Sequence, residues 1–431
     1  MSPPDLPAIR AADEAAAGAP RKRGRPPKRS LRLQILLDGA AELFNLRGIS
    51  ATSVADVADI LGISRASLYY YIDDRDDLVF QCYLRACELT AEDLAAAAGE
   101  PTGLARTLAF VEHALQATRP TAAVLSEIDA LSGARAQAVK AANDLNTATL
   151  IGFIAQGVDD GDIRACDAEV IAQAIAGMLA WAQLLPQWSG SKQMQALRAR
   201  TSKVMISLLT TGLATERGRP FHCSIDVEQF QRTLVNAFDR RESSSVKIDQ
   251  VLAAASRLFN RNGIEATSVD SIAAALGVTK GVLYHYLADK SELVTRCYER
   301  AFDFYDQFIE VSKREGGRGL DRALINGHLN IQAHVSSLSP LMPQPGFGSV
   351  PEARRTSLMK RGRRENEVVA DLLREGVADG SAVACDAAMV THTCAGAFGW
   401  IPKWLPADDT RTRFEIADEI CTMLANGLSV V

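Results

Sequence analysis

Apolar residues near the N-terminus recur at the spacing of an α-helix. Within 31–46 they stand at positions i, i+4, i+7 and i+8, which share one helix face: Leu36, Ala40, Leu43 and Phe44. Ser30 precedes this stretch as an N-cap, and Gly48 ends it. Two shorter helices are predicted next, one capped by Thr52 and one by Ser64. The pattern therefore predicts a unit of three helices.

The same pattern occurs a second time in the other half of the chain. The sequence LFNLRGISATSV at 43–54 returns as LFNRNGIEATSV at 258–269. A later segment, GVDDGDIRACDAEVIAQAIAGMLAW at 157–181, resembles GVADGSAVACDAAMVTHTCAGAFGW at 376–400. A repeat this long indicates two copies of a whole two-part protein, fused head to tail, rather than a solenoid.

Composition sets the broad class of protein. The 431 residues are too many for one ordinary core, and 47% are hydrophobic, so several well-buried domains are expected. We predict that no apolar run is long enough to cross a bilayer, and residues 1–18 lack the apolar core of a signal peptide, which predicts a cytoplasmic protein. The eight cysteines lack zinc-site spacing and no catalytic motif occurs, so no metal, cofactor or enzymatic activity is expected.

The third helix of each unit has residues suited to DNA. A helix fits the major groove, where its first residues meet base edges. Arg65 and Ser67 stand there in one copy, and Thr279 and Lys280 in the other. Gly281 lowers helix propensity but allows the backbone to approach DNA closely. Tyrosines one turn further on can reach phosphates through their hydroxyl groups.

The motif order Thr-Ser-Val, Leu-Gly-Ile/Val-Ser/Thr, Leu-Tyr-x-Tyr and Leu-Val closely resembles the TetR family of transcriptional repressors. The chain departs from the family's usual His-Phe pair at Tyr71-Ile72 and at Tyr286-Leu287. In the first unit the resemblance implies these DNA-facing residues: Thr52, Ser64, Arg65, Ser67, Tyr69, Tyr71 and Arg75. In the second unit it implies these: Thr267, Thr279, Lys280, Gly281, Tyr284, Tyr286 and Lys290.

The resemblance predicts an all-α fold of two tandem units. Each unit has an N-terminal three-helix helix-turn-helix DNA-binding domain and then a helical ligand-binding and dimerisation domain. The expected parts are a disordered basic arm (1–30), DNA-binding domain 1 (31–80), regulatory domain 1 (81–215), a linker (216–245), DNA-binding domain 2 (246–295) and regulatory domain 2 (296–431). Within the linker, apolar spacing predicts a helix over Val227, Phe230, Leu234 and Phe238.

The regulatory domains of the family enclose an apolar ligand pocket, and their last two helices form a four-helix dimer seam. Here the seam candidates are 167–185, 192–213, 386–401 and 410–428. A fused chain can build that seam internally as a pseudo-dimer, or two chains can form a homodimer. Candidate pocket residues are large and apolar, although the same spacing also suits plain core: Met178, Trp181, Trp188, Phe398, Trp400 and Trp404.

A basic arm precedes the first unit. Residues 20–32 contain seven basic residues and no acid, and Arg23, Gly24 and Arg25 followed by proline form the core pattern of AT-hook segments, which lie in the minor groove. The stretch 33–80 has only three bases against eight acids. Since phosphate attraction dominates DNA affinity, this first unit depends on its arm.

These observations predict a sequence-specific DNA-binding transcriptional regulator, a repressor released by a small apolar effector. Its expected partners are a double-stranded DNA operator, the effector and no membrane. The alternative is an architectural DNA-binding protein without an effector, which would lack a deep apolar pocket. A third hypothesis, an enzyme with a helix-turn-helix appendage, requires a cluster of titratable residues that the sequence does not show.

Overall fold

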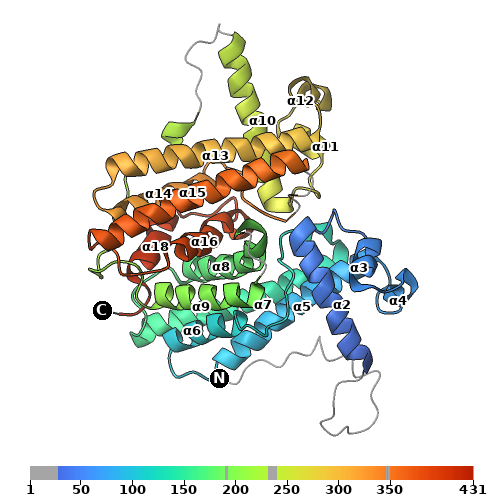
Figure 1. Ribbon diagram of the computed structural model, residues 1–431, viewed down its shortest axis with the longest axis horizontal. Helices are drawn as coiled ribbons and strands as arrows, with labels where there is room; N and C mark the ends of the chain where they lie inside the picture. The colour runs from blue at the N-terminus through green and yellow to red at the C-terminus, as the bar shows by residue number, and fades with distance from the viewer. Residues whose placement is uncertain (1–27, 190–192, 232–239, 346, 348–349, 431) are drawn as a thin grey trace. The chain divides into compact units, whose positions relative to one another are not determined.

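Figure 1 shows the computed structural model of the chain, which describes residues 28–189, 193–231, 240–345, 347 and 350–430. These residues form α-helices, short 3-10 helices and two isolated β-bridges but no strand, which confirms the all-α prediction. The predicted arm with Arg23, Gly24 and Arg25 lies outside the described residues. So do Leu234, Phe238 and the side chain of Trp188.

The first three helices are α2 (Lys28–Arg47), α3 (Val54–Leu61) and α4 (Arg65–Tyr69). Helix α2 already includes Ser30, so the predicted N-cap there is wrong: the preceding lysine and arginine are good helix formers and extend the helix. Ser53, not Thr52, caps α3, where its side chain accepts a hydrogen bond from the Asp56 amide. Thr52 is buried instead, and its hydroxyl donates to the Gly48 carbonyl (2.7 Å).

The second copy repeats these features in α10 (Arg240–Asn262), α11 (Val269–Ala275) and α12 (Lys280–Tyr286). Ser268, rather than Thr267, caps α11, and the buried Thr267 hydroxyl donates to the Gly263 carbonyl (2.8 Å). Helix α10 starts at Arg240, inside the stretch predicted as linker, and the described linker contains the 3-10 helix η2 (Val227–Phe230). The two helix-turn-helix heads thus share a serine cap that follows a buried threonine.

Longer helices follow each head and bury the main core. After the first head come α5 (Arg75–Ala97), α6 (Gly103–Ala114), η1 (Ile128–Ala130), α7 (Gly133–Asp160), α8 (Ala168–Ser189) and α9 (Met194–Thr210). After the second come α13 (Lys290–Glu315), α14 (Gly319–Val335), α15 (Glu352–Ala378), α16 (Ala387–Gly399), α17 (Ile401–Trp404) and α18 (Arg413–Asn426). One continuous apolar cluster includes buried residues from both sets.

The two halves meet along a seam of four helices, α8, α9, α16 and α18, near the centre of Figure 1. Gly177 on α8 faces Gly396 on α16, the equivalent glycine of the repeat. A Cβ added to Gly177 would lie 2.5 Å from the Gly396 carbonyl oxygen, and one added to Gly396 would lie 2.6 Å from the Gly177 carbonyl oxygen. The predicted four-helix seam therefore forms inside a single chain, as the pseudo-dimer alternative expects.

The ends of the two halves are exchanged in the same symmetric way. The Leu213 amide donates to the Leu424 carbonyl (2.9 Å), and the Leu428 amide donates to the Leu209 carbonyl (2.7 Å). Isolated bridges join Ile163 to Ser429 and Ala214 to Ala382. Each of these contacts in one half has its counterpart in the other, so the seam carries a local pseudo-two-fold axis.

The central helix of the seam corrects one sequence prediction. Residues Ala168–Pro186 of α8 have the length and mean hydropathy that a membrane-crossing helix requires, so the prediction that no such run exists is wrong. However, 61% of that window is buried inside the molecule. The apolarity reflects packing of α8 against α16, α9 and α18, because a helix enclosed on several sides has no polar face to expose.

Candidate nucleic-acid interface and effector cavities

The short helix α4 presents its polar residues outward. The Ser67 amide donates to the side chain of the N-cap Ser64 (3.1 Å), which fixes the first turn. Arg65 and Ser67 are exposed, and Tyr69 is 51% exposed one turn on. Leu68 points the other way and is completely buried, so it anchors the helix to its head. This arrangement leaves the first turn available to a major groove.

Helix α12 presents an equivalent face with different chemistry. Thr279 begins the helix but makes no side-chain cap hydrogen bond. Lys280 is exposed, and its Nζ lies 3.0 Å from the Asp270 carboxylate, so part of its charge is already neutralised within the head. Gly281 is exposed, with only the Thr279 hydroxyl near its missing Cβ, and Tyr284 is 46% exposed. Leu283 is the buried anchor here.

The remaining predicted DNA-facing residues are less exposed than those at the start of α4 and α12. Thr52 and Thr267 are buried, and Tyr71 and Tyr286 are half-buried. Arg75 donates to the Thr52 carbonyl (3.1 Å) and to the Ile49 carbonyl, and Lys290 donates to the Glu265 carbonyl (3.1 Å). These two side chains tie the start of the next helix to the loop after the first helix of each head, so much of their hydrogen-bonding capacity is used internally.

Sequence reasoning missed a buried asparagine that connects each head to the domain behind it. Asn45 donates to the Ala122 carbonyl (2.9 Å) and accepts from the Val124 amide (2.9 Å). Asn260 makes the matching pair with the Pro340 carbonyl (2.8 Å) and the Met342 amide (3.0 Å). The signal was present in the repeated triplet Leu-Phe-Asn, where a polar residue ends an apolar pair in both copies.

Two cavities occupy equivalent places behind the heads. The first, of about 160 Å³, lies among α5, α6, α7, α8 and the loop 119–125, and Trp400 of the other half lines it. The second, of about 200 Å³, lies among α13, α14, α15, α16 and α18, and Trp181 of the other half lines it. Because Trp181 and Trp400 are equivalent in the repeat, each half contributes the same residue to its partner's cavity.

The predicted pocket residues divide between cavity and core. Trp181 and Phe398 line the second cavity, and Trp400 lines the first. Met178 is completely buried in the core and Trp404 is half-buried, and neither lines either cavity. The cavities also reach the asparagine contacts, because residues 122–125 line the first and Met342 and Pro343 line the second.

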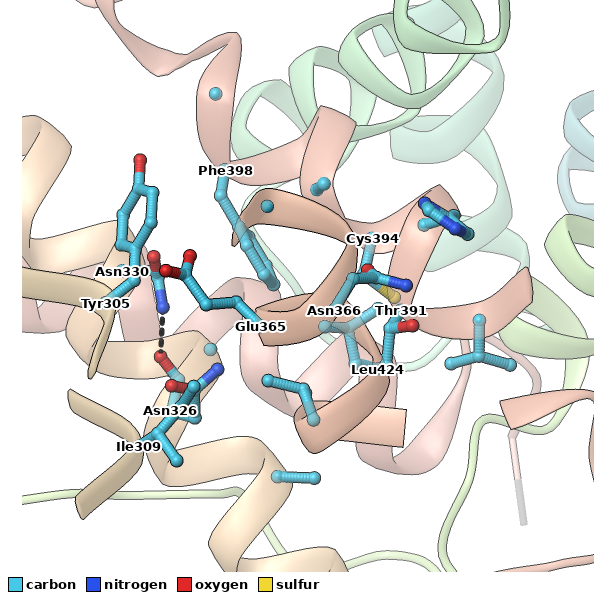
Figure 2. A pocket seen from close by; sticks show the side chains of 18 of the residues that line it. Tyr305, Ile309, Asn326, Asn330, Glu365, Asn366, Thr391, Cys394, Phe398 and Leu424 are labelled. Atoms are coloured by element: carbon cyan, nitrogen blue, oxygen red, sulfur yellow. Dashed lines mark hydrogen bonds between the residues drawn. The ribbon is translucent and has the colours of Figure 1, made fainter. Parts of the chain in front are cut away.

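The polar linings of the two cavities differ. In the first, Asp93 pairs with Arg119 (2.7 Å) and Asn146 donates to the Cys87 carbonyl (2.8 Å). In the second, Figure 2 shows Tyr305, Asn326, Asn330 and Glu365 gathered on one side, with Phe398 projecting between them and the opposite wall. Over the residues that the structure describes, no cluster of side chains suited to a metal ion is present.

Family models match both halves of the chain. The description "Bacterial regulatory proteins, tetR family" matches residues 36–82 and 251–297. The description "Tetracyclin repressor-like, C-terminal domain" matches residues 105–209 and 322–428. Together the two descriptions cover each half from its first helix to its last, in the same order.

Curated relatives match shorter parts of the chain. The HTH-type transcriptional repressor KstR2 of Mycolicibacterium smegmatis is 28% identical over 143 residues, 31% of this chain and 66% of that protein. The HTH-type transcriptional regulator AcrR of Shigella flexneri is 43% identical over 49 residues, 11% of this chain and 23% of that protein. The chain thus spans slightly under two thirds of the first relative's length.

Two solved structures each match less than half of the chain. The crystal structure of AibR in complex with isovaleryl coenzyme A and operator DNA is 22% identical, with a TM-score of 0.35, over 42% of this chain and 98% of that one. The structure of the ketosteroid regulator KstR2 of Mycobacterium tuberculosis is 18% identical, with a TM-score of 0.33, over 43% of this chain and 95% of that one.

Proposed function

This chain belongs to the TetR family of bacterial regulatory proteins, in which it carries two complete units in tandem, and from that premise we propose that it is a DNA-binding transcriptional repressor released by a small, largely apolar effector. The observation that carries the proposal is the pair of exposed recognition helices, α4 and α12, on two halves that one internal seam joins. A single chain then carries two recognition helices and a four-helix seam, which in the family a dimer of two chains would supply.

The two recognition helices contact two unlike half-sites. Ser64, Arg65 and Ser67 meet base edges or phosphates in one half-site, and Thr279, Lys280 and Gly281 do so in the other. Arg23, Gly24 and Arg25 of the basic arm bind the adjacent minor groove. Because the heads differ in sequence, the operator is an imperfect palindrome, and covalent linkage replaces dimerisation with a high effective concentration of the second head.

The effector acts through the asparagine contacts. A ligand in either cavity presses on the loop that Asn45 or Asn260 holds, and that loop is bonded to the first helix of a head. Release from DNA requires that the ligand bind the DNA-incompatible arrangement more tightly than the compatible one. The two cavities support this mechanism over the architectural alternative, which has no use for an apolar cavity behind each head.

The relatives named above are transcriptional regulators, and we extend this to the chain as a regulator without enzymatic activity that works in the cytoplasm, where its DNA lies. Helix α8, which is long and apolar enough to cross a membrane, packs in the seam and the core, so it has a role that does not involve a membrane.

The deciding experiment is selection of DNA fragments from a random pool, followed by the light-scattering mass of the protein free and on the selected site. We expect one chain on one site of imperfect symmetry. Two chains on a symmetric or doubled site would replace the internal pseudo-dimer with a four-headed dimer. Failure to select any consensus would reject the repressor in favour of an architectural protein.

A further inference from the structure

The second cavity contains buried polar atoms that the protein itself leaves unsatisfied. Asn326 is 6% exposed and His334 is 8% exposed, and both line the cavity. Among the described residues, neither Asn326 Oδ1 nor His334 Nδ1 has a hydrogen-bond partner. Burial lowers the pKa of His334 to about 4, so its imidazole is neutral and one ring nitrogen can accept. Buried acceptors without donors are costly, which indicates a missing partner.

A carboxylate lies in the same wall with an excess of negative charge around it. Glu365 is 7% exposed and lines the cavity, and Arg361 Nε stands 3.1 Å from its Oε1. Arg361 is shared, however, since its guanidinium also lies 2.9 Å from Asp303 and 2.6 Å from Asp306 on α13. Three carboxylates thus face Arg361, and Arg364 has a smaller effect on Glu365.

A proton bound to Glu365 reduces this local excess of negative charge. Burial, reinforced by Asp306 and opposed by Arg361, raises the pKa of Glu365 to about 8. At neutral pH the side chain is therefore mostly protonated. A cation that enters the cavity and displaces this proton would restore the balance of charges, and the aromatic faces of Tyr305, Phe398 and Trp181 in the lining favour a cation further.

The first cavity offers no such site. Counting back along α7 and α15 from the repeated segments places Asn146 where the second half has Glu365. The Asn146 side chain donates to the Cys87 carbonyl. The buried acid of that cavity, Asp93, pairs with Arg119 at 2.7 Å, and the exposed Glu92 is the second carboxylate beside that guanidinium. Both cavities have apolar walls, so the difference between the two cavities lies in their polar groups.

We propose that the second cavity, and not the first, binds a compact amphipathic amine in its protonated form. Its ammonium group pairs with Glu365, its N–H donors reach acceptors such as Asn326 Oδ1 and His334 Nδ1, and its apolar body packs against Phe398 and Trp181. Arg363, the one arginine or lysine of the lining, is exposed and stands on the solvent side of the cavity. Burial lowers the pKa of both lining histidines, His334 and His392. The proposal rests on the proposed effector role of the cavities and specifies the class of ligand.

The test uses the full chain and three probes with the same body: 4-phenylbutylamine, 4-phenylbutan-1-ol and 4-phenylbutyrate. Calorimetry at pH 7 should show the amine binding at least about tenfold more tightly than the other two, because a buried charge pair is worth more than about 1.4 kcal/mol. Amine binding should release close to one proton, and its affinity should rise with pH up to about 8, where Glu365 loses its proton unaided.

Two variants provide the matched comparison. Glu365→Gln should reduce amine affinity to that of the alcohol and abolish proton release. Glu367→Gln makes the same charge change on the exposed side of α15 and should change nothing. Equal binding of amine and alcohol, tightest binding of the butyrate, no binding of any probe, or full amine binding by Glu365→Gln would each overturn the proposal.

A parallel DNA titration separates this inference from the proposed function. If the amine binds as described but leaves DNA affinity unchanged, the cavity assignment stands and the effector role fails. If the selected operator is released by a ligand of another class while the amine does not bind, the repressor stands and the assignment of the amine fails.

Discussion

At the seam the two halves make equivalent backbone contacts, whereas the walls of their cavities have different polar side chains. Gly177 and Gly396 face one another, and the chain ends exchange the same backbone hydrogen bonds in both directions. In the cavity walls, by contrast, Asn146 of the first half occupies the repeat position that Glu365 has in the second half, and the two side chains have different partners. Backbone contact at van der Waals distance tolerates no added atom, while a cavity wall tolerates any side chain that fits. Duplication therefore left symmetry in the seam and allowed specificity to diverge.

The largest effect should come from breaking the symmetric part. Gly177→Ala or Gly396→Ala places a methyl group about where a backbone carbonyl of the other half already lies, so each should cost about 3 kcal/mol of unfolding free energy, and the two costs should be similar. Thermal unfolding of the full chain measures this. Gly152→Ala is the control, because nothing lies within 4 Å of its missing Cβ, and it should be neutral or slightly stabilising. Tolerance of both seam variants would contradict the close approach.

The two heads differ in their charge, which gives the next prediction. The first head has eight acids and three bases over 33–80, while 248–295 has five acids and four bases. Removal of residues 1–27, which keeps α2 whole, deletes Arg21, Lys22, Arg23 and Arg25. We expect DNA affinity to fall by about 100-fold and the slope of log affinity against log salt to decrease by about three to four. Unchanged affinity in a salt titration would show that the first head needs no arm.

Much of this architecture could be predicted from the sequence, and the failures have a common cause. The repeat and the helix spacing could be predicted because they depend on local pattern, and the resemblance to the TetR family supplied the seam helices. Thr52 and Ser53 are both good N-caps, however, and only packing decides that Thr52 turns inward to the Gly48 carbonyl. Arg75 stays a predicted DNA contact, but its hydrogen bonds to the Ile49 and Thr52 carbonyls depend on tertiary structure and could not be predicted from residue type. Trp181 and Trp400 each line the cavity of the other half, and this too depends on tertiary structure rather than on local pattern.

The cavity difference predicts that the acid of the second cavity lowers stability up to a higher pH than the acid of the first, because burial raises the pKa of Asp93 only to about 6. Since burial raises the pKa of Glu365 to about 8 from 4.5, the folded chain holds a proton that the unfolded chain has lost between those values. Its contribution to stability is therefore full below about pH 4.5 and declines as pH rises to about 8, by at most about 1.4 kcal/mol per unit. Glu365→Gln should remove this decline, so its melting temperature should exceed that of the parent increasingly from pH 5 to 8. Parallel melting curves over that range would refute the assignment, and Glu367→Gln should follow the parent.

The smallest predicted effect distinguishes the recognition helices from one another. Arg65 is exposed at the start of α4, whereas Lys280 at the start of α12 is already bound to Asp270 at 3.0 Å, an interaction that also raises the pKa of Lys280. Arg65→Ala should therefore weaken operator binding by about tenfold and relax specificity in one half-site, because an unpaired guanidinium gives its full charge and hydrogen bonds to DNA. Lys280→Ala should weaken binding less, since part of the free energy that the lysine gains from DNA is lost in breaking its contact with Asp270.

The variant Asp270→Asn sharpens the comparison: it releases Lys280 and removes a carboxylate from the same face, so it should strengthen binding to the second half-site. Titrations against operators mutated in one half-site at a time measure all three variants, and a larger loss for Lys280→Ala than for Arg65→Ala would show that the second head, not the first, dominates recognition.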